Sequence, residues 1–275
     1  PILTYAKGFS NENDSMTEQE LEKALRTAAE ADVAVIFAGL PEIFESEGYD
    51  RTSMKLPKCQ DRLIEEVLKV QPNVVVVLHN GSPVELPWAD RVSAILEMYL
   101  GGQGVGEACD RLLFGEANPS GRLAETFPYR LEDNPSFLHF PGNGKRVLYG
   151  EDIFVGYRYY DTKKVPVRYA FGHGLSYTEF TYGDLTLSSA QMTDEDILTV
   201  SLKVKNSGKT EGKEVVQLYV ADLCGISERP VKELKGFAKV HLLPGEEKTV
   251  SMEISARNLS YYEERLGDWY APSGT

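Results

Sequence analysis

Cysteine is scarce in this chain of 275 residues, and histidine is nearly as rare. The three cysteines, Cys59, Cys109 and Cys224, lie far apart, and none belongs to a C-x-x-C pair, the spacing typical of metal and redox sites. We expect them to be buried thiols in a reducing compartment. Three of the four histidines are scattered and pair with no cysteine or carboxylate at ligand spacing. The sequence therefore predicts no metal site and no cofactor.

Long apolar runs and an excess of positive charge are also missing. No apolar run approaches the roughly 20 residues that cross a bilayer, and Pro1 opens no charged-then-apolar leader. The 29 basic residues against 42 acidic ones give a net charge of −13, which argues against a nucleic acid or an anionic membrane as partner. Because no Met precedes Pro1, we interpret the start as internal. We expect a cytoplasmic protein, and a secreted one stays open because a signal peptide would be lost with the missing part.

The first part of the chain alternates helical and strand patterns. Thr17 and Glu20 form the spacing of a capping box ahead of an apolar helical stripe, and a second helix is predicted near 57–71. Short apolar runs predict strands buried on both faces at 34–38, 73–78 and 94–100. Strands that alternate with helices predict an α/β domain with a parallel sheet.

The pattern changes after Phe180. Alternating apolar residues at 198–204 and 216–220 are separated by turn residues, and no helical pattern follows until the end. This is typical of an antiparallel β-sandwich of roughly 100 residues. We therefore predict two domains, an α/β domain over 1–178 and a β-sandwich over 179–275.

An acidic loop follows the first strand without a break. It reads G-L-P-E-I-F-E-S-E-G-Y-D-R from Gly39 to Arg51 and contains Glu42, Glu45, Glu47 and Asp50. Loops at the carboxyl ends of parallel strands usually hold the ligand. Carboxylates that share a partly dry site raise the pKa of at least one of them, which makes that group a candidate general acid. From these residues alone, a solvated acidic loop is the alternative.

A glycine-rich turn and an aromatic stretch could each be a ligand site or a structural feature. The turn at 101–106 follows a strand and opens a helix, as in dinucleotide-binding proteins, but it reads G-G-x-G-x-G and not G-x-G-x-x-G. Glu107 would compete there with a phosphate for the free N–H groups, so a tight packing turn is favoured. Aromatic residues gather at 149–160 and form either a sugar-stacking wall or packing between domains.

Several motifs resemble one enzyme family. The loop E-S-E-G-Y-D-R is similar to the carboxyl-terminal half of glycoside hydrolase family 3, which includes many bacterial and fungal β-glucosidases. Further similar stretches are G-S-P-V-E-L-P-W at 81–88 and F-G-H-G-L-S-Y-T-E-F at 171–180. The stretch R-P-V-K-E-L-K-G-F at 229–237 resembles the fibronectin type III-like domain that follows in many members. The resemblance implies a parallel-sheet α/β sandwich followed by a fibronectin III-like sandwich whose last strand is cut short.

The resemblance implies part of a retaining, exo-acting β-glucosidase that hydrolyses terminal non-reducing β-D-glucosides. A barrel domain of the same enzyme would supply the nucleophile, since nothing here matches eight β/α repeats, and the acidic loop would supply the general acid/base. The matching residue is Glu45 in the first place and Glu47 in the second. The expected partners are that barrel domain and an oligosaccharide or aryl β-glucoside, and a homo-oligomer stays open.

The remaining candidate residues surround the acid/base position. Phe44, Tyr49, Arg51 and His79 are expected to contact the substrate. Arg51 is also expected to hold the loop by pairing with Asp50 or a neighbouring carboxylate, and His79 is equally well explained as a structural histidine. The alternative function is a non-catalytic carbohydrate-binding or scaffold module.

Overall fold

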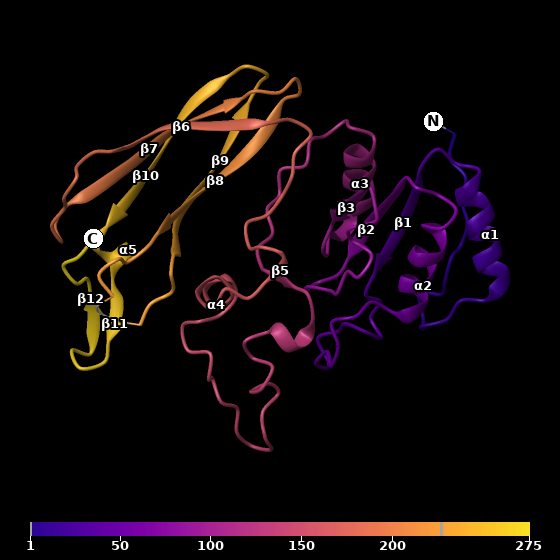
Figure 1. Ribbon diagram of the computed structural model, residues 1–275, viewed down its shortest axis with the longest axis horizontal. Coiled ribbons are helices and arrows are strands. Elements are labelled where there is room, and N and C mark those ends of the chain that lie inside the picture. The colour runs from indigo at the N-terminus through magenta and orange to yellow at the C-terminus, as the bar shows by residue number, and fades with distance from the viewer. Residues whose placement is uncertain (1, 226–227) are drawn as a thin grey trace. The chain divides into compact units, whose positions relative to one another are not determined.

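The computed structural model describes residues 2–225 and 228–275, and it divides into two compact units (Figure 1). The first unit comprises Pro1–Asp110 and Phe127–Asn134, and the second comprises Arg111–Thr126 and Pro135–Thr275. A parallel sheet with helices precedes antiparallel β-sheets, so the predicted fold class is confirmed. No helix among the described residues is long and apolar enough to cross a membrane.

The first unit is built on a three-stranded parallel sheet in the order β1-β2-β3. The register aligns Gly39 with His79 and Val75 with Ala94. The elements are α1 (Glu18–Ala29), β1 (Ala34–Gly39), α2 (Lys58–Val67), β2 (Val74–His79), β3 (Ala94–Glu97), η1 (Gly102–Gly104), α3 (Val105–Leu113, of which Arg111–Leu113 belong to the second unit), β4 (Phe127–Pro128) and η2 (Leu131–Asp133).

Local side-chain bonds set where the helices begin and end. The Glu20 N–H donates to Thr17 Oγ1 at 3.2 Å and the Thr17 N–H donates to Glu20 Oε2 at 2.9 Å, so the predicted capping box begins α1. The second helix ends at Val67 and not near residue 71. Pro72 disfavours a helical backbone at the preceding Gln71. The Gln71 side chain turns back, and its Nε2 donates to the Ala28 carbonyl at 3.0 Å.

The first strand of the sheet is buried on one face and exposed on the other, whereas the central strand is buried on both. Ile36 and Ala38 of β1 are buried, but Val35 is 40% exposed and Phe37 is 52% exposed. The expectation of burial on both faces is therefore wrong for the edge strand β1, but it is confirmed for the central strand β2, where Val76 and Val77 point to opposite faces and are both fully buried. The third strand also ends early, at Glu97.

Two antiparallel sheets form the sandwich of the second unit, in the orders β10-β7-β6 and β8-β9. Val200 and Val204 of β7 and Val216 of β8 are buried, as the alternation predicted at 198–204 and 216–220 requires. The core consists of Val204, Val216, Leu242, Val250 and Met252. The elements of this unit are α4 (Tyr157–Lys163), β5 (Val167–Tyr169), β6 (Phe180–Leu187), β7 (Ile197–Asn206), β8 (Gly212–Val220), β9 (Glu233–Leu242), β10 (Glu247–Ser255), α5 (Ala256–Leu259), β11 (Tyr261–Glu263) and β12 (Asp268–Tyr270).

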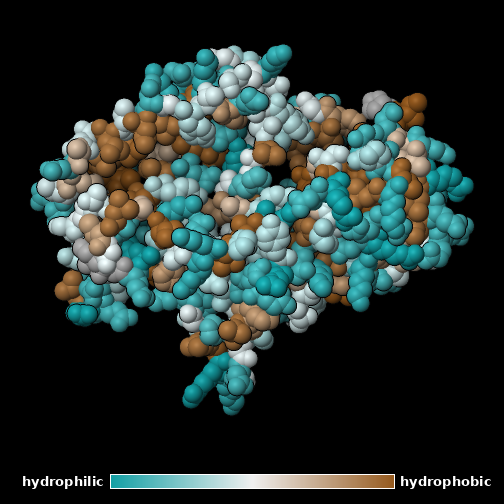
Figure 2. Space-filling view, viewed as in Figure 1, coloured by the Kyte–Doolittle hydropathy of each residue, from teal (hydrophilic) through white to brown (hydrophobic). Residues whose placement is uncertain are grey.

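The aromatic stretch at 149–160 divides between the surface and the interior. Tyr157 stacks on Phe171 with ring centroids 4.8 Å apart, and Tyr160 is buried. Tyr149, in contrast, is 87% exposed and lies in a segment whose apolar side chains reach the surface (Figure 2). The stretch therefore does not form one continuous wall.

The cysteines differ in their surroundings. Cys59 and Cys109 are buried, but Cys224 is exposed. The expectation of three buried thiols is therefore wrong for Cys224, which lies in the loop that follows β8 and outside the sandwich core. Burial raises the pKa of Cys59 to about 12, so this thiol stays protonated at neutral pH.

Candidate active site

The acidic loop leaves β1 as a tight, internally bonded turn. The Phe44 and Glu45 N–H groups both donate to the Pro41 carbonyl, at 2.7 and 3.1 Å. The Tyr49 hydroxyl donates to the Glu42 carbonyl. These bonds draw the two ends of the loop together, so its backbone has a defined shape.

One carboxylate of the loop is held by a second loop, the one that follows β2. Glu45 Oε2 accepts the Gly81 N–H at 2.6 Å, and Glu45 Oε1 accepts the Ser82 hydroxyl at 2.8 Å. Arg51 Nη1 lies 3.4 Å from Glu45 Oε1 and donates to Ser82 Oγ at 2.6 Å and to the Pro83 carbonyl at 3.3 Å. We call Glu45, Arg51, Gly81, Ser82 and Pro83 the clamp.

Sheet register explains why the two loops meet. Gly39 and His79 are partners in neighbouring parallel strands, so the residues that follow them leave the sheet at the same edge. The Gln60 side chain bonds both the N–H and the carbonyl of Gly39 at 2.9 Å, which fixes the end of β1. Gly39 itself lies so close to the His79 carbonyl oxygen that a Cβ atom would collide with it.

The other carboxylates of the loop have no such anchor. Glu47 and Asp50 are exposed, and neither makes a hydrogen bond or ion pair with any residue that the structure describes. Glu45 is different, since its side chain is only 19% exposed. The loop thus presents one fixed carboxylate, Glu45, and at least two free ones, of which Glu47 lies only two residues from Glu45.

The aromatic and histidine candidates lie at or near the same edge. Tyr49 is 47% exposed, and Phe44 is half-buried. The half-buried His79 stacks on Phe37, with ring centroids 6.4 Å apart and planes 10° from parallel. This contact gives His79 a packing role beside the exposed face of β1. The predicted contact of His79 with a substrate stays a prediction.

A buried polar layer supports the loop after β2, and the sequence did not reveal it. Asn80 is fully buried, and its Nδ2 donates to the Ser82 carbonyl at 3.0 Å and to Glu97 Oε2 at 3.2 Å. Glu97 Oε1 accepts the Tyr99 N–H at 2.8 Å, and Tyr99 has a positive φ of 48°, which turns the chain out of β3. The stretch H-N-G-S-P at the end of β2 was the available signal.

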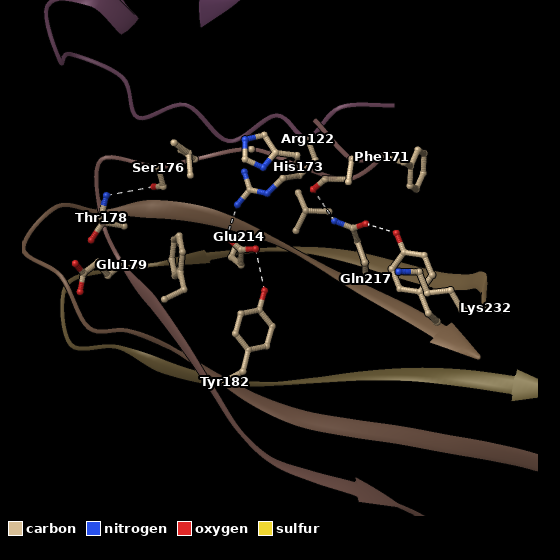
Figure 3. A pocket seen from close by; sticks show the side chains of 17 residues that line it. Arg122, Phe171, His173, Ser176, Thr178, Glu179, Tyr182, Glu214, Gln217 and Lys232 are labelled. Carbon is tan, nitrogen blue, oxygen red and sulfur yellow. Dashed lines mark hydrogen bonds and ion pairs between the residues drawn. The ribbon is translucent and has the colours of Figure 1, made fainter. Parts of the chain in front are cut away.

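A separate groove lies in the second unit (Figure 3). It has a volume of about 800 Å³, and none of the predicted site residues lines it. Its polar side chains bond to one another: Arg122 pairs with Glu214, which also accepts the Tyr182 hydroxyl at 2.8 Å. Gln217 accepts the Tyr219 hydroxyl at 2.7 Å. The pair of Arg122 with Glu214 joins the segment at 111–126 to the sandwich within this unit.

Both parts of the chain are similar to known protein families. The glycosyl hydrolase family 3 C-terminal domain matches residues 2–177, and a fibronectin type III-like domain matches residues 214–275. The chain is 55% identical over 272 residues to the thermostable β-glucosidase B of Acetivibrio thermocellus, covering 99% of this chain and 36% of that protein. The predicted boundary between 178 and 179 stays a prediction.

Solved structures have the same fold. The β-glucosidase of Kluyveromyces marxianus in complex with glucose has a TM-score of 0.88 and 45% identity, covering 94% of this chain and 31% of that one. The family 3 β-glucosidase of Bifidobacterium adolescentis has a TM-score of 0.94 and 40% identity, covering 98% of this chain and 40% of that one. The chain spans about a third of the length of the curated relatives it matches. The family predicted from the motifs is confirmed, and the chain belongs to glycosyl hydrolase family 3, whose C-terminal domain and fibronectin type III-like domain it contains.

Proposed function

We propose that this chain is the part of a retaining, exo-acting β-glucosidase that supplies the general acid/base, and that Glu47 is that residue. The curated relatives are named β-glucosidases, and one related crystal structure holds glucose. The substrate class is therefore a terminal, non-reducing β-D-glucoside of an oligosaccharide or an aryl alcohol. A barrel domain outside this chain supplies the nucleophile.

The observation that carries this proposal is the difference between Glu45 and Glu47. Both oxygens of Glu45 accept hydrogen bonds, from the Gly81 N–H and the Ser82 hydroxyl, and its side chain is only 19% exposed, so this carboxylate faces protein groups and little solvent. Glu47 is exposed and has no partner among the described residues. We therefore place Glu47 before Glu45 as the acid/base, which reverses the order predicted from the sequence.

The mechanism needs two carboxyl groups on opposite sides of the glycosidic bond, about 5 to 5.5 Å apart. In the first step the nucleophile attacks the anomeric carbon, the bond to the leaving oxygen breaks, and Glu47 gives its proton to that oxygen. In the second step Glu47 takes a proton from a water molecule, whose oxygen attacks the anomeric carbon and releases the nucleophile. Arg51 acts here through the loop, since it faces Glu45 and Ser82.

A non-catalytic carbohydrate-binding module is the rival function. The groove of Figure 3 would be its site, but Arg122, Glu214 and Gln217 of this groove bond to protein groups. A sugar site needs polar groups that converge on the ligand. The geometry therefore favours the catalytic role.

The test is leaving-group dependence in a complete enzyme. The chain is joined to the N-terminal remainder of the Acetivibrio thermocellus relative, and Glu47→Ala is compared with the unmodified fusion on aryl β-glucosides of graded leaving-group pKa. We expect kcat/KM to fall about 10²- to 10⁴-fold for poor leaving groups and far less for activated ones, with azide restoring activity by forming a glucosyl azide. An equal loss on all substrates would contradict the assignment.

A further inference from the structure

We propose that Glu45 is a positioning residue. The clamp that it forms with Arg51 and Ser82 holds the Glu47 carboxyl group where it can transfer a proton to the leaving oxygen. This inference rests on the proposed function of Glu47. It assigns no chemistry to Glu45 itself. The clamp acts by fixing the acidic loop to the loop that follows β2.

The clamp joins two segments that are distant in the sequence. Glu45 bonds the backbone at Gly81 and the side chain of Ser82, which lie 36 and 37 positions further along the chain. Arg51, at the far end of the acidic loop, reaches Ser82 and the Pro83 carbonyl. Both ends of the segment that contains Glu47 are therefore tied to one short stretch of backbone.

Anchoring at these two points limits how far Glu47 can move. Glu47 lies two residues after one anchor, Glu45, and four before the other, Arg51, and both anchors bind the same stretch at 81–83. The segment between the anchors therefore cannot swing away from this edge of the sheet while both hold. An isolated bridge between Ser46 and Tyr49 closes the turn around Glu47. A displacement of about 1 Å in a reacting group can cost 10²-fold in rate. Loss of the anchor would therefore impair proton transfer with Glu47 still present.

Charge makes the anchor stronger than an ordinary turn contact. Glu45 and Arg51 side chains are 19% and 16% exposed, so their mutual attraction is screened less than that of a surface pair. Hydrogen bonds that involve an ionised group are roughly twice as strong as neutral ones. The fully buried Asn80 donates to the Ser82 carbonyl, so the stretch of backbone that binds Glu45 is itself fixed.

The test is a double-mutant cycle in the complete fusion enzyme. Glu45→Ala is expected to lower kcat/KM about 10- to 100-fold on glucosides with poor leaving groups, and less on activated ones. Azide should not restore its activity, because the Glu47 carboxylate is retained. In the Glu47→Ala background the same Glu45→Ala change is expected to have almost no further effect, since the residue it positions is gone. Glu45→Gln, which keeps an acceptor for the Gly81 N–H, is expected to recover part of the loss.

Each outcome has a distinct meaning. Ser82→Ala removes the two bonds of the Ser82 hydroxyl, to Glu45 and from Arg51, but leaves the Gly81 N–H and the Arg51–Glu45 pair, so it is expected to give a weaker version of the Glu45→Ala result. Glu42→Ala, which removes an exposed carboxylate of the same loop, serves as the matched control. If Glu45→Ala lowers activity equally with and without Glu47, the positioning role is wrong and the proposed function stands. If azide rescues Glu45→Ala but not Glu47→Ala, Glu45 is the acid/base, and the proposal for Glu47 fails along with the clamp.

Discussion

The ion pair between Arg122 and Glu214 allows the sharpest stability prediction. Glu214 lies on the same face of β8 as the core residue Val216, two positions further along the strand. Both charged side chains of the pair are 10% exposed. Glu214→Ala would leave the Arg122 guanidinium buried without its carboxylate and the Tyr182 hydroxyl without its acceptor.

The magnitude follows from that burial. Removal of one partner of a buried pair typically costs about 3 to 5 kcal/mol. For a unit of this size, 1 kcal/mol corresponds to a shift of about 2 to 4 °C in Tm, so we expect the second unit to unfold about 6 to 20 °C earlier. Replacement of both partners, as Arg122→Met with Glu214→Leu, leaves no unpaired charge and should recover most of the loss.

Differential scanning calorimetry at physiological ionic strength measures these shifts. Burial, and then the hydrogen bond to Glu214, raises the pKa of Tyr182, so an ultraviolet titration of Glu214→Ala should show this tyrosine ionising at lower pH than in the unmodified chain. A shift in Tm below about 2 °C for Glu214→Ala, less than 1 kcal/mol, would refute the reasoning. So would a double variant that is as unstable as the single one.

Two further predictions concern the first unit. Burial raises the pKa of Asp61 to about 6 from its usual 3.8, and the Trp88 Nε1–H donates to it at 2.9 Å. The folded state therefore binds this proton more tightly than the unfolded state, and stability should rise as pH falls through 6 towards 4. Thermal melts should show that Asp61→Asn stabilises the unit at pH 7.5 by about 1 kcal/mol, allowing for partial exposure of the carboxyl group. At pH 4 the variant should have no effect on stability. Equal effects at both pH values would contradict this prediction. Gly39→Ala should push β1 from the His79 carbonyl and speed hydrogen exchange of the Leu40 N–H, which donates to that carbonyl at 2.9 Å; unchanged exchange would contradict it.

The elements that the sequence predicted well are those with local causes. The capping box of Thr17 and Glu20 needs only neighbouring residues, and the alternating patterns of β7 and β8 need only their own strands. The open face of β1 had no such signal. An apolar run has the same appearance whether one or both faces are covered, because coverage depends on other segments.

The clamp also had no local signal. Glu45 and Glu47 differ by two positions in an acidic loop, and their different surroundings arise only because Gly39 pairs with His79 and brings Ser82 to the same edge. The pair of Arg122 with Glu214 joins residues 92 positions apart. Sequence patterns located the acidic loop, but three-dimensional contacts were needed to distinguish the residues within it.

We propose above that this chain provides the acid/base part of a β-glucosidase active site, and that a barrel domain outside it provides the nucleophile. The most direct measurement is the hydrolysis of an aryl β-glucoside by the 275-residue chain alone and by the chain joined to the remainder of its Acetivibrio thermocellus relative. We predict no turnover by the chain alone, and turnover by the fusion that depends on Glu47 for substrates with poor leaving groups. Turnover by the chain alone would contradict the account, since the nucleophile would then lie within these residues.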